Sequence, residues 1–149
     1  MKLKELCVLD VVCCHRGTTI AQAARLMRQH HTGDLVVIDE SDGSREPIGM
    51  ITDRDIVMEV TAKSHDPERT QVSQVMTSPL VVASGSESVA TAIQRMREHG
   101  VRRLPIVDDN GAVFGIITLD DLYRVLAEHT AALASIVSKE QTRENRGRR

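Results

Sequence analysis

The hydrophobic positions of this chain follow the same order twice. A short apolar run comes first in each copy, "DVVCC" at 10–14 and "LVVAS" at 80–84, and it predicts an extended segment or short strand. Apolar residues at Ile20–Met27 and Val89–Met96 then recur with the i, i+3, i+4, i+7 spacing of an amphipathic helix. Buried strands are predicted next, from "DLVVID" and "RLPIVD".

The second part of each copy predicts a hairpin followed by another helix. Polar stretches "ESDGSREP" and "DNGAVF" contain the turn residues of hairpin connections, and they lead into "IGMIT" and "FGIIT". The helix after them has an apolar face made of Ile56, Val57 and Val60 in one copy, and of Leu119, Leu122, Tyr123 and Leu126 in the other. The pattern predicts an α/β (α+β) fold of two β-α-β-β-α repeats. A repeat of about sixty residues buries little apolar surface alone, so we expect the two to pack sheet to sheet around one core.

The repeat is also visible in residue identities. With a shift of 69 positions, seven of the twenty residues at 20–39 are identical to those at 89–108, and the shift then falls to 66 because the first hairpin loop is three residues longer. We therefore expect repeat 1 at 1–68 and repeat 2 at 69–130. Residues 131–149 are expected to extend a helix and to end in the polar, basic, solvated and frayed tail "QTRENRGRR".

Composition excludes several classes of protein. The 149 residues are 41% hydrophobic and 27% charged with a net charge of −2, which does not suggest a general nucleic-acid binder. Phe114 and Tyr123 are the sole aromatic residues, so stacking platforms for single-stranded nucleic acid are not expected. Because no apolar run approaches ~18 residues, no membrane span is predicted. Three cysteines without a signal peptide favour a reducing, cytoplasmic location.

An octapeptide recurs before the last helix of each copy, as "GMITDRDI" at 49–56 and "GIITLDDL" at 115–122. The Thr-x-x-Asp spacing is that of a capping box at a helix N-terminus, which needs no ligand. A helix N-terminus also binds phosphate or ribose oxygens, and an aspartate on its first turn can accept ribose hydroxyls. Gly49 and Gly115 would then let the strand lie close to a bound ring. The octapeptides are compatible with both interpretations, which do not exclude each other.

These octapeptides, together with "VSQVMTSPLVVASGSESVATAIQRM" at 72–96 and "GVRRLPIVDDNG" at 100–111, resemble cystathionine-β-synthase (CBS) domains. The resemblance covers roughly residues 3–128, and it is to a standalone tandem pair, or Bateman module. It implies two repeats related by pseudo-two-fold symmetry, with two clefts between them that bind adenosine nucleotides.

The resemblance implies that each cleft draws on both repeats. One cleft would use Thr52, Arg54, Asp55, Ser88, Val101, Arg102 and Arg103, with Pro105 completing "GVRRLP". The other would use Thr18, Thr19, Thr32, Gly33, Asp34, Thr118, Asp120 and Asp121. Arg102 and Arg103 can bind phosphate, whereas Gly33 and Asp34 at the equivalent positions supply no cation. We therefore expect the arginine-containing cleft to bind phosphorylated ligands more tightly.

The expected function is a non-catalytic regulatory module that binds an adenine nucleotide, most simply AMP, with ATP, ADP, NAD and S-adenosyl ligands also open. We expect a homodimer that signals by conformational change to an unidentified effector protein. A structural dimerisation module without ligand is one alternative, and a small metal-dependent nucleotide hydrolase using Asp53 or Asp120 is another. No metal is expected, because the adjacent Cys13 and Cys14 would point to opposite faces of a strand.

Overall fold

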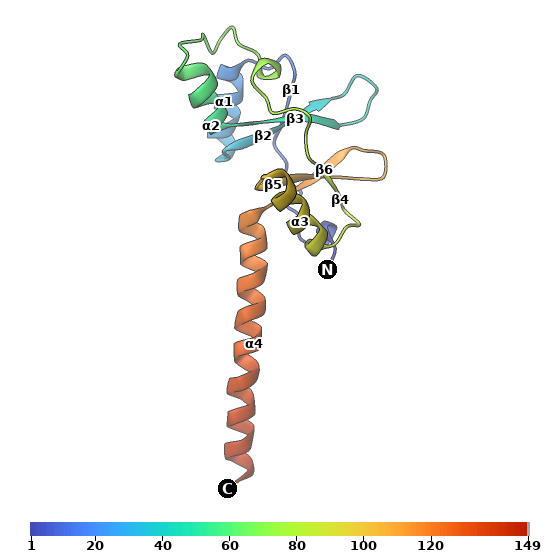
Figure 1. The fold of residues 1–149 in the computed structure, drawn as a ribbon, viewed down its shortest axis with the longest axis vertical. Coiled ribbons are helices and arrows are strands. Elements are labelled where there is room, and N and C mark those ends of the chain that lie inside the picture. Colours follow the sequence, from blue (N-terminus) through green and yellow to red (C-terminus); the bar gives the residue numbers. More distant parts are fainter. Residues whose placement is uncertain (149) are drawn as a thin grey trace. The chain divides into compact units, whose positions relative to one another are not determined.

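The structure is a computed structural model, and it describes residues 1–148. The chain divides into two compact units, residues 1–117 and the residues from Thr118 onward. The first unit contains both predicted sheets (Figure 1).

Two three-stranded sheets build the first unit, in the orders β1-β2-β3 and β4-β5-β6. In the first sheet β1 is parallel to β2, and β2 is antiparallel to β3 with an irregularity between Val37 and Ile38. The predicted α/β (α+β) class and the element order of each repeat are confirmed. The elements are η1 (Leu3–Glu5), β1 (Cys13–His15), α1 (Ile20–His30), β2 (Asp34–Asp39), β3 (Glu46–Thr52), α2 (Asp53–Ile56), the π-helical turn η2 (Val57–Thr61), η3 (Val72–Gln74), β4 (Ala83–Ser84), α3 (Val89–His99), β5 (Arg103–Val107) and β6 (Val113–Thr118).

Helices α1 and α3 begin and end in equivalent ways. The hydroxyl of Thr19 accepts a hydrogen bond from the backbone N–H of Gln22, and Ser88 does the same for Thr91. The residue that follows each helix has a left-handed backbone conformation, with φ of 51° at His31 and 64° at Gly100. Strands β1 and β4 are shorter than the apolar runs that predicted them, since those runs continue as irregular chain.

The sheets share a hydrophobic core, as the repeat pattern predicts. Val36 and Ile38 from β2 and Met50 from β3 form one buried cluster with Val113 and Ile116 from β6. A single folded repeat would expose its face of this cluster to water. Burial of the cluster therefore stabilises the packing of the two repeats against each other. A second cluster joins α1 to the other face of the first sheet and includes the fully buried Ile20, Leu35, Val37 and Ile51.

The segments that open the two repeats are exchanged. Val8 forms an antiparallel bridge with Ile116 of the second sheet, whereas Thr77 forms the equivalent bridge with Met50 of the first sheet. Backbone N–H groups of Leu3 and of Lys4 also donate to carbonyls before α3, at 3.0 Å each. Each sheet is therefore completed by chain from the other repeat, which holds the two repeats together through backbone hydrogen bonds.

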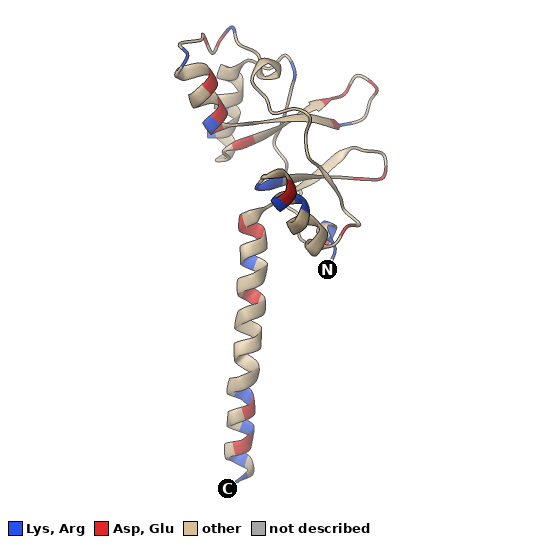
Figure 2. Ribbon diagram, viewed as in Figure 1, with Lys and Arg blue, Asp and Glu red and all other residues tan. Residues whose placement is uncertain are grey.

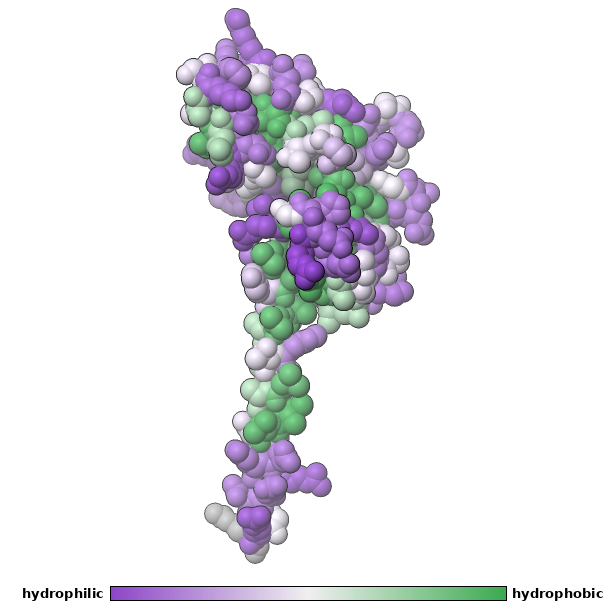
Figure 3. All heavy atoms as spheres, viewed as in Figure 1, coloured by the Kyte–Doolittle hydropathy of each residue, from purple (hydrophilic) through white to green (hydrophobic). Residues whose placement is uncertain are grey.

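Helix α4 (Leu119–Gly147) makes up most of the second unit. It continues to Gly147, so the prediction of a frayed tail is wrong within the described residues. Gln, Arg and Glu dominate this end, and their high helix propensity accounts for the difference. Its last turns alternate basic and acidic residues (Figure 2), and a hydrophobic stretch precedes them (Figure 3). None of the helices in residues 1–148 has the length and hydrophobicity that a membrane span requires.

Candidate functional site

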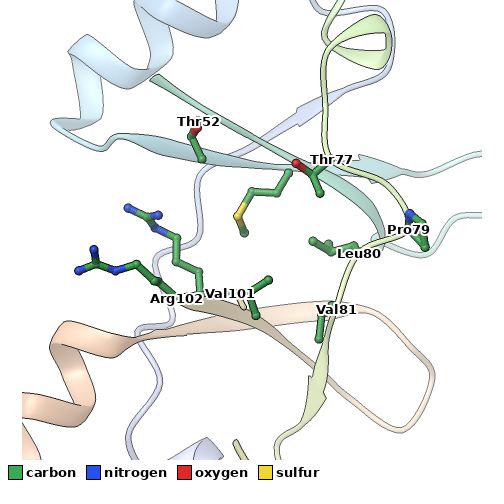
Figure 4. A pocket seen from close by; sticks show the side chains of 9 residues that line it. Thr52, Thr77, Pro79, Leu80, Val81, Val101 and Arg102 are labelled. Atoms are coloured by element: carbon green, nitrogen blue, oxygen red, sulfur yellow. The ribbon is translucent and has the colours of Figure 1, made fainter. Parts of the chain in front are cut away.

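A cavity of about 210 Å³ opens between the two sheets of the first unit (Figure 4). Sites that enclose a drug-sized ligand measure about 300–1,000 Å³, so this one can enclose part of a nucleotide and leave the rest at its mouth. Its lining comes from strand β3, from the segment before β4 and from the start of β5: Met50, Thr52, Thr77, Pro79, Leu80, Val81, Val101, Arg102 and Arg103.

The cavity has a polar end and an apolar end. Figure 4 shows Thr52 and Arg102 at one end and Pro79 and Leu80 at the other. The arginines follow Gly100, whose left-handed backbone ends α3 and turns the chain toward β5. Such a lining suits a molecule with a flat apolar ring and an anionic group, because guanidinium groups form forked hydrogen bonds to phosphate.

Arg103 forms an ion pair across the repeats. Its Nε lies 2.5 Å from Oδ2 of Asp34, and the Asp34 side chain is 17% exposed. The two residues are equivalent under the 69-residue shift, and they were expected in different clefts. The structure instead brings them together, so a phosphate at Arg103 would compete with a carboxylate that already partners it.

Thr52 and Asp55 form the predicted capping box at the start of α2. The backbone N–H of Asp55 donates to Thr52 Oγ1 at 3.1 Å, and the backbone N–H of Thr52 donates to Asp55 Oδ2 at 2.9 Å. Thr52 lines the cavity, whereas Asp55 and Arg54 are outside its lining. The cap therefore fixes the direction of the threonine at the polar end.

The equivalent pair in the second unit has an additional partner. Thr118 caps α4 with Asp121, whose Oδ2 accepts the backbone N–H of Thr118 at 2.9 Å and its hydroxyl at 2.8 Å. Oδ1 of Asp121 accepts a hydrogen bond from the Arg124 guanidinium. Met58 holds the equivalent position in the first repeat. The two octapeptides thus share a cap but differ in the charge beside their aspartates.

The other expected site residues of the first unit mostly serve local structure. Ser88 caps α3, and Pro105 is buried inside β5. Thr19 caps α1, and Thr18 Oγ1 accepts the backbone N–H of His15 and borders a shallow groove beside α1. The carbonyl of Gly33 accepts the backbone N–H of Asp53 at 2.9 Å, and Thr32 Oγ1 bonds the backbone of Asp34. In the second unit, Asp120 lies in the first turn of α4.

Sequence reasoning missed five lining residues: Met50, Thr77, Pro79, Leu80 and Val81. Four of them belong to the segment before β4, of which only Leu80 and Val81 lie in the run predicted as a strand. The signal for their position is the exchanged bridge between Thr77 and Met50, and it is not local in sequence.

The glycines of the octapeptides face protein rather than an open site. A Cβ at Gly49 would lie 2.5 Å from Met76 Sδ and 3.0 Å from the Thr77 carbonyl oxygen. At Gly115 it would lie 2.6 Å from Cys7 Sγ. The expectation that these glycines make room for a bound ring is wrong, because the exchanged segments occupy that space.

The cysteines lie in environments that suppress ionisation. Cys14 packs in the first core and Cys13 against the shared core, so the two side chains point to opposite faces of β1. Burial raises the pKa of the Cys14 thiol to about 12, and it also raises the pKa of Cys7 and of Cys13. Among residues 1–148, no group of three or more His, Cys, Asp and Glu side chains could hold a metal ion.

Comparison with known proteins places this geometry in a family. The model of the CBS domain matches residues 3–62 and again residues 72–128. The CBS domain-containing protein YhcV of Bacillus subtilis is 40% identical over 120 residues, which are 80% of this chain and 81% of YhcV. The uncharacterized protein MK0525 of Methanopyrus kandleri is 36% identical over 121 residues, 81% of this chain but 60% of MK0525.

Solved structures show the same arrangement. Hypoxic Response Protein I, solved with two coordinated zinc ions, superposes with a TM-score of 0.73 and 28% identity, covering 83% of this chain and 98% of that one. CBS domain protein PAE2072 from Pyrobaculum aerophilum, complexed with AMP, has a TM-score of 0.73 and 24% identity over 82% of this chain and 90% of that one. This chain and PAE2072 therefore share a fold.

Proposed function

The chain belongs to the CBS domain family and carries two copies of the domain, and from this premise we propose that it is a regulatory module that binds an adenine nucleotide. The cavity between the sheets is the proposed site. Its combination of an apolar end with two arginines is the observation that carries the proposal.

Each part of a nucleotide has a matching part of the cavity. The base would lie among Leu80, Val81 and Val101, because aliphatic side chains and backbone groups are what the lining offers to a ring. The phosphate would bind at Arg102 and Arg103. Thr52 would contact the ribose, and Asp55, one turn into α2, would accept ribose hydroxyls at the cavity mouth.

AMP is the proposed ligand, ahead of ADP, ATP and NAD. A cavity of about 210 Å³ encloses a base and ribose more readily than a dinucleotide. PAE2072, which shares this fold, is complexed with AMP. Asp34 neutralises part of the positive charge of Arg103. The charge that remains balances a monophosphate better than a triphosphate, because a triphosphate carries more negative charge.

Asp121 is proposed to contribute less to nucleotide binding than Asp55 does. Asp121 already bonds Arg124, so its carboxylate is less available to ribose hydroxyls than that of Asp55. Gly33 and Asp34 supply no cation for a phosphate.

Regulation would follow if the bound nucleotide stabilised one arrangement of the two repeats over another. A nucleotide shifts such an equilibrium only if it binds one arrangement more tightly than the other. We propose that this shift is passed to an effector protein through a homodimer of the module.

Calorimetric titration with AMP, ADP, ATP, NAD and adenosine tests the site. Replacing Arg103 by alanine should weaken AMP binding about tenfold or more, because a charged hydrogen bond to phosphate is lost, and should leave adenosine binding nearly unchanged. Arg97→Ala, on the exposed side of α3, is the matched control. Absence of binding by every nucleotide would refute the proposal, as would equal AMP affinity in the Arg103 and Arg97 variants.

Incubation with ATP and magnesium separates this function from nucleotide hydrolysis. We expect unchanged ATP after prolonged incubation, and release of ADP or AMP at a constant rate would replace the regulatory proposal with an enzymatic one.

A further inference from the structure

Helix α4 carries an apolar face that begins near the end of the region matched by the CBS domain and continues beyond it. The family match ends at residue 128, whereas the helix continues to Gly147. Leu126, Leu133, Ile136 and Val137 are each between 55% and 65% exposed. At 3.6 residues per turn these four side chains fall within an arc of about 100°, so they form one stripe. Figure 3 shows this hydrophobic stretch along the helix.

We propose that this stripe binds the same stripe of a second copy of the chain, as a parallel two-stranded coiled coil. Leu126 and Leu133 are seven residues apart and take the a positions of a heptad, with Ile136 at a d position. Val137 follows at e and widens the contact. His129 takes the remaining d position, and a polar residue in the seam is a common device that fixes register.

The charged end of α4 favours this partner and this direction. Lys139 is at g and Glu144 is at the e position five residues later, so in a parallel pair each Lys139 faces the partner's Glu144. From Leu126 to Ile136 the parallel arrangement joins apolar layers to apolar layers, apart from the His129 layer. Beyond Val137 the seam positions are charged, with Glu140 at a and Arg143 at d, so the apolar contact ends there and the opposite charges of Lys139 and Glu144 flank it.

A second copy also accounts for the length of the helix. From Leu126 to Val137 the apolar seam spans about 17 Å at 1.5 Å per residue, and charged residues extend the helix beyond it. Helices of this composition gain most of their stability from packing an apolar face, and the self-complementary stripe supplies that packing without another protein. The proposal does not depend on nucleotide binding.

Sedimentation of the full chain over a range of concentrations tests the pairing. Leu133→Glu places like charges in facing a positions, and the dimer should dissociate at least about tenfold more readily. Ala131→Glu adds the same charge at the outward f position and should leave association unchanged. A wild-type chain that stays monomeric at high concentration would overturn the proposal, and so would a dimer that Leu133→Glu does not weaken.

Charge exchange tests the direction. Lys139→Glu alone faces the partner's Glu144 with a like charge and should weaken the dimer about three- to fivefold. The double variant Lys139→Glu with Glu144→Lys restores opposite charges only in the parallel register, and it should recover the wild-type association. Failure of the double variant to recover association would overturn the parallel arrangement.

Discussion

Asp34 and Arg103 occupy equivalent positions in the two repeats, and they carry opposite charges that meet at 2.5 Å. Most equivalent positions in this chain keep the same chemical character, as Met27 and Met96 do in the helices. Asp34 and Arg103 differ where the repeats face each other, and two arginines or two aspartates in contact there would repel. The pair therefore makes the repeats unequal at the residue scale.

Removing the charge of Asp34 should strengthen the binding of phosphorylated ligands. In Asp34→Asn, Arg103 no longer divides its charge between a carboxylate and a phosphate. Because the pair is partly exposed and screened, we expect AMP affinity to rise only about two- to fivefold. Calorimetric titration measures this effect, with Asp109→Asn as a control of the same charge change. Unchanged or weaker AMP binding in Asp34→Asn would contradict the proposed competition.

Cys14 should make the folded state sensitive to alkaline pH. Burial raises the pKa of its thiol from 9.0 to about 12, so the unfolded chain loses this proton at lower pH than the folded chain. The contribution to stability is complete below about pH 9 and is lost as pH rises toward 12. Between pH 8 and pH 10 it amounts to about 1 kcal/mol.

Urea unfolding at both pH values measures this loss. Cys14→Ala is less stable at each pH because of its cavity, but it should lose less stability between them than the wild type. An equal loss in the two proteins would show that Cys14 does not contribute.

At the scale of elements, the exchanged segments determine which substitutions the strands β3 and β6 can accommodate. A Cβ at Gly49 would press on the Thr77 carbonyl, which already accepts the backbone N–H of Met50 at 3.2 Å. Gly49→Ala should therefore destabilise the protein by about 1–3 kcal/mol, the usual cost of overpacking. Gly17→Ala is the matched control, since nothing lies within 4 Å of its added Cβ. Similar urea midpoints for the two variants would contradict this packing.

Local patterns predict the elements well and their contacts poorly. The period of apolar residues placed α1 and α3, and the Thr-x-x-Asp spacing placed the caps of α2 and α4, because these signals lie within a few residues. The bridge from Thr77 to Met50 could not be inferred in this way, so the apolar end of the cavity was missed. The contact between Asp34 and Arg103 depends on how the two sheets pack, and the spacing of apolar residues does not predict that packing.

At the scale of the whole molecule, the first eight residues belong structurally to the second repeat. Leu3 is fully buried, and the backbone N–H of Ile116 donates to the Val8 carbonyl at 3.0 Å. Deleting residues 1–8 should expose the edge of β6, so the Ile116 amide should exchange with solvent at least about tenfold faster. The Met50 amide has the equivalent bond to Thr77 and should keep its protection. Equal acceleration at both amides would indicate general unfolding instead.

The exchange of opening segments has a consequence for the origin of the chain. A protein with one repeat could complete its sheet only by borrowing the N-terminal segment of another molecule, as subunits of a domain-swapped dimer do. Joining two such molecules end to end converts a contact that depends on concentration into one that is always present. Two separately expressed halves of this chain should therefore associate by exchanging their opening segments.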